Sequence, residues 1–261
     1  MAAIYAAYLA DKGTERANWA WRQLGQTFGP LRPDQVTRGA CRSYVVSRRT
    51  AGAGDGTIHT ELSFLRAALR WHSKTTPAQV ELPSKPPPLD HCLSREQYGA
   101  LLAAADTPHA RLFIVLALAT AGRMTAILEL TWDRVDFERG LIRLGKGERR
   151  RKGRATVPMT DRAREALMEA ARARTCERVI EYGGKPVGKI RHAFATVAVA
   201  AELPWCTPHV LRHTAAVWMA EEGVPMAEIA QYLGHSDSRI CERVYARFSP
   251  SHLRRAARAL G

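Results

Sequence analysis

Residues 83–88 read Pro-Ser-Lys-Pro-Pro-Pro and divide the 261-residue chain into two unequal parts. Consecutive prolines favour a stiff, extended backbone and cannot continue a helix. A single hydrophobic core cannot run through such a segment, so the chain is expected to fold as two domains joined by a linker. We expect boundaries at 1–82 for an N-terminal domain, 83–92 for the linker, 93–249 for the main domain and 250–261 for a C-terminal helix.

The N-terminal domain is expected to be a small helical bundle. Apolar residues recur at helical spacing, which predicts helices from about residue 4, over 15–28, from Pro33 to about Arg49, and from Thr57 onward. Any one arginine here can be a solvated surface charge, but the group favours contact with a polyanion. The basic residues that we expect to serve this purpose are Arg42, Arg48, Arg49, Arg66 and Arg70.

The main domain is expected to be helical with a small sheet. Ser94 followed by Gln97 is a capping-box pattern, and the almost wholly apolar stretch 109–121 predicts a buried helix. Residues 140–144 and 154–157 predict short strands on either side of a basic loop. The predicted fold class is therefore mainly α with a small β-sheet (α+β).

The charge of the chain points to a nucleic acid as its partner. It carries 39 Lys and Arg against 25 Asp and Glu, a formal net charge of +14. An anionic membrane is the competing partner, but the longest apolar run, Leu112 to Ala121, is too short to span a bilayer. The start lacks a basic segment before its apolar residues, so we expect no signal peptide and a cytoplasmic location. Five dispersed cysteines predict free thiols and no metal site.

The stretch from Thr207 to Thr214 predicts a helix start that can hold a phosphate. Thr207 is a favourable N-cap and Pro208 suits the first helical position. His209 and Arg212 then project from one side of the first turn, beside unpaired backbone N–H groups and the positive end of the helix dipole. A zinc helix is the alternative for two histidines four apart, but it needs a glutamate after His209, where this chain has Val210.

Four blocks in order give this stretch its context. They are Thr120 to Arg123, Pro208 to Thr214, Leu233-Gly234-His235 and Arg243-Val244-Tyr245. Together they resemble the tyrosine recombinases, the phage-integrase family of DNA strand-exchange enzymes. The resemblance covers about residues 93–249, and the ordered combination is far more specific than any single block.

The resemblance implies a set of catalytic residues: Arg123, Lys146, His209, Arg212, His235 and Tyr245. Tyr245 would attack a DNA phosphate and form a 3′-phosphotyrosyl bond, which needs neither metal nor any other cofactor. Lys146, on the basic loop, is the expected general acid, and Lys152 is the alternative. Arg151 and Lys152 are also expected to contact DNA.

The resemblance also implies partners. We expect double-stranded DNA as substrate, self-association into a tetramer on DNA, and accessory DNA-bending proteins. Residues 1–82 would form the core-binding domain, with no arm-binding domain ahead of it. The C-terminal helix of residues 250–261 would dock on a neighbouring protomer.

The chain departs from the family pattern at four positions. Gly122 stands where a leucine is usual, Ala126 where an acidic residue is usual, and Glu129 is the candidate substitute for that acid. Tyr245 follows His235 by ten residues where nine is common, and Cys241 stands where a threonine is common. These departures keep an alternative open: a non-catalytic DNA-binding protein, either a decayed recombinase or a regulator resembling a helix-turn-helix protein.

Overall fold

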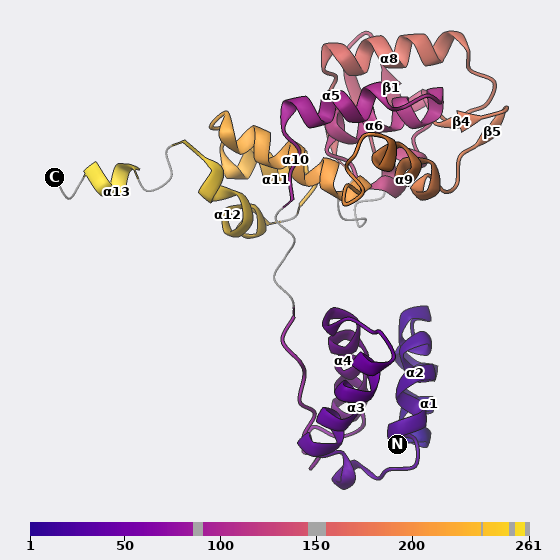
Figure 1. The fold of residues 1–261 in the computed structure, drawn as a ribbon, viewed down its shortest axis with the longest axis vertical. Coiled ribbons are helices and arrows are strands. Elements are labelled where there is room, and N and C mark those ends of the chain that lie inside the picture. Colours follow the sequence, from indigo (N-terminus) through magenta and orange to yellow (C-terminus); the bar gives the residue numbers. More distant parts are fainter. Residues whose placement is uncertain (86–90, 146–154, 236, 251–253, 259–261) are drawn as a thin grey trace. The chain divides into compact units, whose positions relative to one another are not determined.

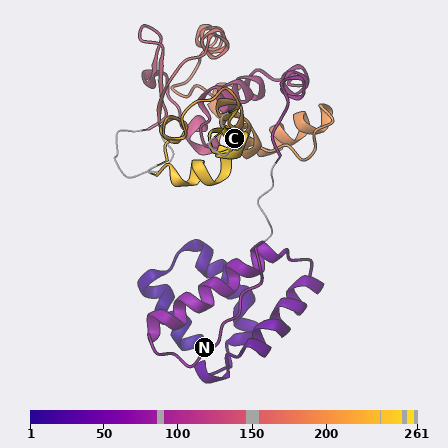
Figure 2. The same cartoon turned by 90° about the vertical axis from the view of Figure 1, so that its left-hand side faces the viewer.

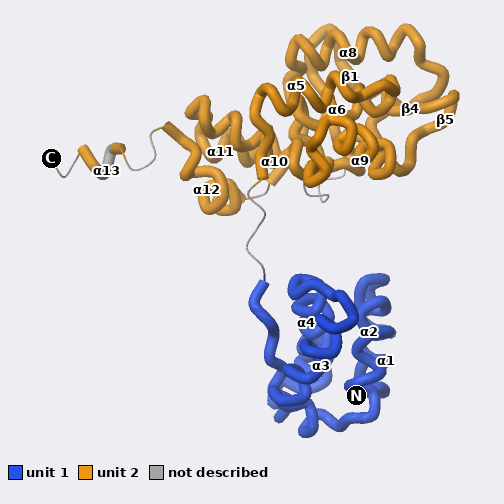
Figure 3. Tube along the Cα trace, in the orientation of Figure 1, with its two compact units in different colours: residues 1–89 blue, residues 90–261 orange. Residues whose placement is uncertain are grey.

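The computed structural model describes residues 1–85, 91–145, 155–235, 237–250 and 254–258. The chain divides into two compact units, Met1–Leu89 and Asp90–Gly261 (Figure 3). The expected fold class, mainly helical with a small antiparallel sheet, is confirmed.

Unit 1 is a bundle of four helices (Figures 1 and 2). They are α1 (Ala2–Lys12), α2 (Glu15–Phe28), α3 (Arg38–Thr50) and α4 (Asp55–His72), with a short 3-10 turn, η1 (Pro33–Gln35), before α3. The interior consists of fully buried side chains such as Leu24, Phe28, Leu62 and Leu65. These residues recur at helical spacing, so each helix turns one apolar face inward.

Two helix starts in unit 1 differ from the prediction. The helix expected from Pro33 is interrupted after one 3-10 turn, because Thr37 caps α3 by accepting from the backbone N–H of Ala40 at 3.2 Å. The fourth helix begins at Asp55 and not at Thr57. An acidic residue in the first turn interacts favourably with the helix dipole, which explains the earlier start.

Unit 2 contains nine helices among its described residues. They are α5 (Arg95–Ala103), α6 (Pro108–Thr120), α7 (Met124–Leu128), α8 (Asp161–Arg172), α9 (Arg191–Ala200), α10 (Pro208–Glu221), α11 (Met226–Tyr232), α12 (Arg239–Tyr245) and α13 (Arg254–Arg258). Two 3-10 turns, η2 (Trp132–Arg134) and η3 (Ala246–Phe248), complete the set. The predicted capping box at Ser94 and Gln97 is confirmed. Helix α6 packs against both α8 and α10, which explains its apolar sequence.

The sheets of unit 2 are small. Strands β1 (Val135–Asp136), β2 (Leu141–Arg143) and β3 (Thr156–Pro158) form an antiparallel sheet in that order. Strand β1 was not expected, and the two predicted strands are shorter than predicted. A second pair, β4 (Glu181–Tyr182) and β5 (Lys185–Pro186), forms a hairpin. The hairpin turns at Gly183 and Gly184, which both have positive φ.

Helix ends in the last third of unit 2 position the candidate site. Thr207 is the N-cap of α10, as predicted, although its side chain makes no capping hydrogen bond. Pro225 is the N-cap of α11 and directly precedes its first residue, Met226. Gly223 and Gly234 follow α10 and α11 with φ of +78° and +64°, values that glycine adopts without steric cost.

Candidate active site around Arg212

Arg212 lies in the first turns of α10 and its side chain is buried, with 4% of the residue exposed. Its Nη1 donates to the carbonyl of Ala121 at 2.6 Å, and its Nη2 donates to the carbonyl of Leu233 at 2.9 Å. The same Nη2 lies 2.9 Å from Nε2 of His235. Among the described residues, these hydrogen-bond acceptors are neutral and none is a carboxylate. A buried guanidinium with only neutral partners is prepared to receive an anion.

The electrostatics of Arg212 agree with this geometry. The pKa of Arg212 is lowered to about 10, first by burial and then by the positive charge of Arg123. The guanidinium remains protonated at neutral pH. The two arginines therefore act on each other through like-charge repulsion, which an anion placed between them would relieve.

The turn after α6 brings the acceptor carbonyl to Arg212. Ala121 ends α6 in the left-handed region, with φ of +48°. The hydroxyl of Thr120 accepts from the backbone N–H of Gly122 at 3.1 Å and so holds the turn closed. A Cβ at Gly122 would lie 2.9 Å from the Thr120 hydroxyl and 3.0 Å from a methyl of Leu144. A larger side chain at this position would therefore require the side chains of Thr120 and Leu144 to shift.

Arg123 follows directly and is the N-cap residue of α7. Its Nη1 is buried and has no hydrogen-bond partner among the described residues. Ala126, at the position of the missing acid, is buried in the core and cannot orient the guanidinium. The backbone carbonyl of Glu129 accepts from Arg134, and a role for the Glu129 carboxylate beside Arg123 stays a prediction.

His209 and His235 lie within electrostatic reach of both arginines. Desolvation lowers the pKa of each imidazole, and the charges of Arg212 and Arg123 lower both further. Both rings are therefore neutral near pH 7 in the absence of a bound anion. His209 is exposed in the first turn of α10, whereas His235 follows α11 and is half-buried.

Tyr245 ends α12 and is buried, with 8% exposed. Its hydroxyl lies 3.4 Å from Nδ1 of His213, and the two ring centroids are 5.3 Å apart. Desolvation raises the pKa of the phenol, an effect that Arg212 opposes and Cys241 reinforces. No role for His213 was predicted from the sequence. Its position one helical turn after His209 is the sequence feature that could have indicated such a role.

A cavity of about 580 Å³ opens beside the site. It is lined by Arg123 and His209, and also by Arg191 at the start of α9, which the sequence analysis did not single out. A larger cavity of about 1060 Å³ includes Trp132 and Arg174 but none of the predicted catalytic residues that the structure describes. The structure thus brings together Arg123, His209, Arg212, His235 and Tyr245. Lys146, Arg151 and Lys152 lie outside the described residues.

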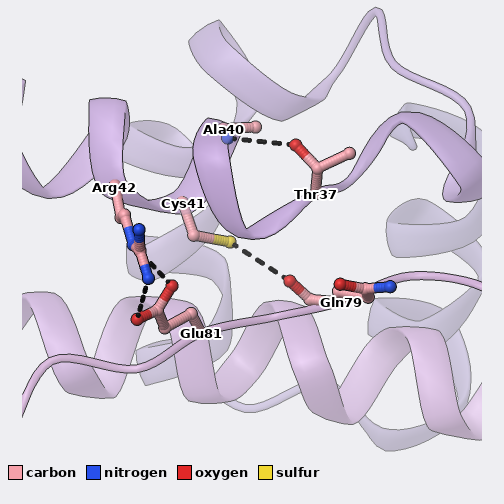
Figure 4. Close-up of polar contacts among 6 residues, drawn as sticks. All are labelled: Thr37, Ala40, Cys41, Arg42, Gln79 and Glu81. Atoms are coloured by element: carbon pink, nitrogen blue, oxygen red, sulfur yellow. Dashed lines mark hydrogen bonds and ion pairs between the residues drawn. The ribbon is translucent and has the colours of Figure 1, made fainter.

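Three of the predicted DNA-binding arginines of unit 1 are paired with carboxylates of the same chain. Arg42 makes two hydrogen bonds to Glu81, at 2.9 and 3.2 Å (Figure 4). Arg49 forms a similar exposed pair with Asp55. Arg48 pairs with the buried carboxylate of Glu61.

Arg48 belongs to a buried network. Its guanidinium binds both carboxylate oxygens of Glu61, at 3.1 and 2.8 Å, and the Tyr44 hydroxyl donates to the same carboxylate at 2.7 Å. Arg66 and Arg70 instead line a small cavity of about 250 Å³ together with Arg38, a residue the sequence analysis did not name. The arginines of unit 1 thus fall into two groups. Arg42, Arg48 and Arg49 are paired with carboxylates of the same unit, whereas Arg38, Arg66 and Arg70 line one cavity.

Among the described residues, no three His, Cys, Asp or Glu side chains lie close enough to hold a metal ion. In the part of the chain that the structure describes, no helix is both long and hydrophobic enough to cross a bilayer.

Comparison with known proteins identifies the family of the chain. The phage integrase family model matches residues 91–252. The tyrosine recombinase XerC of Mycobacterium leprae is 29% identical over 251 residues, covering 85% of this chain and 83% of the relative.

Solved structures share the fold. The Tn1549 transposon integrase in complex with transposon right-end DNA superposes with a TM-score of 0.81 at 18% identity, over 99% of this chain and 98% of that chain. A lambda integrase tetramer bound to a Holliday junction gives a TM-score of 0.70 at 17% identity, over 94% and 76%.

The fold and the assembled arginines, histidines and tyrosine define a tyrosine-type site-specific DNA recombinase. The chain belongs to the phage integrase family, and the resemblance seen in its sequence is confirmed.

Proposed function

We propose that this chain cleaves and rejoins double-stranded DNA at a specific site through a covalent link to Tyr245. The phenol oxygen attacks the scissile phosphorus, the bond to the 5′ oxygen breaks, and a 3′-phosphotyrosyl bond forms. A 5′-hydroxyl from a partner strand then reverses the reaction and releases the tyrosine. The phosphotyrosyl bond conserves the energy of the broken bond, so the scheme needs no ATP and no metal ion.

The observation that carries this proposal is the environment of Arg212. Its buried guanidinium has only neutral acceptors among the described residues and lies within electrostatic reach of Arg123 and Tyr245. Two such cations can bind the non-bridging oxygens of a phosphate and stabilise the charge that grows in the transition state. His209, at the helix N-terminus, is placed to add a hydrogen bond.

Two proton transfers complete the scheme. His213 lies against the Tyr245 hydroxyl and can accept its proton as the phenol attacks. The 5′ oxygen needs a proton as it leaves, and Lys146 is our proposed donor, with Lys152 as the alternative. Both lysines lie outside the described residues, so their assignment rests on the family resemblance.

Unit 1 supplies the second half of the DNA-binding surface in this proposal. We assign residues 1–82 to a core-binding domain, 83–92 to a linker and 93–249 to the catalytic domain. Arg38, Arg66 and Arg70 are the side chains of unit 1 that we assign to phosphate contacts, because they share one cavity and have no carboxylate partner among the described residues.

Strand exchange requires several protomers. We propose that four copies assemble on DNA, that residues 250–261 of one copy dock on its neighbour, and that accessory DNA-bending proteins assist. The lambda integrase neighbour is a tetramer on a Holliday junction, which supports this assembly by analogy. A cytoplasmic location follows from DNA as the substrate.

A suicide DNA substrate tests the chemistry. The substrate carries a nick near the cleavage site, so cleavage releases a short fragment and traps the protein–DNA adduct, which is resolved on a denaturing gel. We expect an adduct with the wild-type chain and none with Tyr245→Phe, although the variant still binds the DNA. Binding of the true site without any adduct would instead support the alternative of a non-catalytic DNA-binding protein.

A further inference from the structure

A chain of three side chains links Arg212 to the helix that carries the nucleophile. Nη2 of Arg212 lies 2.9 Å from Nε2 of His235, and Nδ1 of the same ring lies 3.3 Å from Sγ of Cys241. Cys241 is fully buried and lies four residues before Tyr245 on α12. Residues four apart share one helix face, so the thiol and the phenol lie on the same side of α12.

The chemistry of the guanidinium decides where the proton of His235 lies. An arginine side chain has only N–H donors, so the nitrogen that faces it, Nε2, must present a lone pair. The ring is neutral because desolvation and the charges of Arg212 and Arg123 disfavour protonation. Its single proton is therefore on Nδ1, which faces Cys241 Sγ, and the sulfur accepts that hydrogen bond.

We propose that Cys241 is a positioning residue that, together with Arg212, stabilises the Nδ1–H tautomer of His235 by accepting the Nδ1–H hydrogen bond. In this tautomer Nε2 stays an acceptor for Arg212 and keeps the guanidinium aimed at the phosphate site. The inference rests on the proposed function and extends it. It also gives a physical role to a residue that departs from the family pattern, where threonine is common.

The tautomer with its proton on Nε2 would break the hydrogen bonds that link Arg212, His235 and Cys241. A proton on Nε2 would face an N–H of Arg212, donor against donor, and the guanidinium would lose one of its three acceptors. Its remaining partners, the carbonyls of Ala121 and Leu233, both belong to backbone turns and leave the side chain less constrained. Loss of this hydrogen bond should therefore lower the rate of cleavage and leave the affinity for DNA unchanged.

Three variants of the full chain test this inference. Cys241→Ser keeps a small acceptor, Cys241→Ala removes it, and Cys241→Val fills the space with an apolar group. We expect single-turnover adduct formation to fall about tenfold in the alanine and valine variants, the size of one hydrogen bond, while the serine variant retains most of the rate. The dissociation constant for DNA should not change. Cys41→Val, at a buried cysteine of unit 1, is the matched control and should cleave normally.

The tautomer itself can be measured without DNA. In protein labelled with nitrogen-15 at histidine, the imidazole nitrogen shifts of His235 should show a protonated Nδ1 and an unprotonated Nε2. We expect the preference to be weaker in the valine variant, where Arg212 alone favours it, and unchanged in the serine variant. Thermal unfolding of each variant confirms that it is folded.

Two results would overturn the inference: a valine variant that cleaves at the wild-type rate, or a wild-type His235 with its proton on Nε2. A wild-type chain that forms no adduct would overturn the proposed function instead. The nitrogen shifts would still decide the tautomer in that case.

Discussion

Arg212 and Ala121 are 91 positions apart in the chain, and the guanidinium of the first donates to the carbonyl of the second at 2.6 Å. The contact exists because Ala121 adopts φ of +48° at the end of α6, which turns its carbonyl out of the helix. Left-handed backbone is costly for an alanine, so the surrounding packing must hold it. The buried turn therefore helps to fix the direction of a charged side chain that the sequence alone places only on α10.

Arg212→Lys is expected to lower the rate of adduct formation by about 10²–10³-fold. A lysine keeps the charge, but one ammonium group cannot reach two carbonyls and a phosphate with the fork geometry of a guanidinium. Single-turnover cleavage of the suicide substrate measures the loss. Arg139→Lys, on the exposed surface of unit 2, is the control, and equal losses in both variants would contradict the assignment.

The stability of the DNA-free chain should fall as the pH drops below about 6.5. The pKa values of His209 and His235 lie below their ordinary value of 6.5 in the folded chain, so the unfolded chain binds more protons in this range. Stability then rises with pH until the unfolded histidines are neutral, and it is lost as the pH falls toward the folded pKa values. Urea denaturation between pH 5 and 8 measures the slope.

A double variant, His209→Gln with His235→Gln, should show a shallower slope over the same pH range. A bound phosphate should have a similar effect, because its negative charge raises the pKa of both imidazoles. An unchanged slope in the double variant would assign the pH dependence to other groups.

Arg66→Gln combined with Arg70→Gln should weaken DNA binding and reduce its dependence on salt. Each lost phosphate contact is expected to lower the salt slope of the binding constant by about one. Fluorescence anisotropy at several salt concentrations measures both effects. Arg42→Gln is the matched control, because Glu81 already engages that guanidinium. If Arg42→Gln weakened DNA binding more than the double variant did, the assignment of phosphate contacts to Arg66 and Arg70 would be contradicted.

Glu61→Gln should destabilise unit 1 by about 2–4 kcal/mol, because it leaves the Arg48 guanidinium without its buried counter-charge. Glu61 is fully buried and binds both Arg48 and Tyr44. Asp55→Asn removes the partner of Arg49 in an exposed pair and should cost less than about 1 kcal/mol. Urea denaturation of the two full-length variants compares them, and similar losses would show that the buried network contributes little.

Deletion of residues 250–261 should weaken assembly on DNA and leave the binding of a single protomer unchanged. Leu253 and Leu260 lie in this basic segment, whose apolar spacing suits docking on a neighbour. Gel-shift titrations separate the first binding event from later ones. Unchanged cooperative binding in the truncated chain would argue against docking in trans.

Much of the fold follows from local sequence. Helix α2 was predicted at its observed bounds because its apolar spacing is regular, and in the structure Thr14 caps its start. Strand β1 could not be predicted, because its two residues become a strand only by pairing with Leu141 and Ile142. The start of α3 was missed because a proline and a threonine cap compete within five residues, and tertiary packing decides between them.

By itself, the sequence determined the order of the catalytic blocks and the excess of positive charge, because both are properties of residues along the chain. Only the tertiary structure decided that Arg212 is buried among neutral acceptors, that His213 faces Tyr245 and that Cys241 contacts His235. These relations join α6, α10, α11 and α12, whose packing depends on contacts far apart in sequence. Burial and hydrogen-bond geometry arise from that packing, so no local pattern could reveal them.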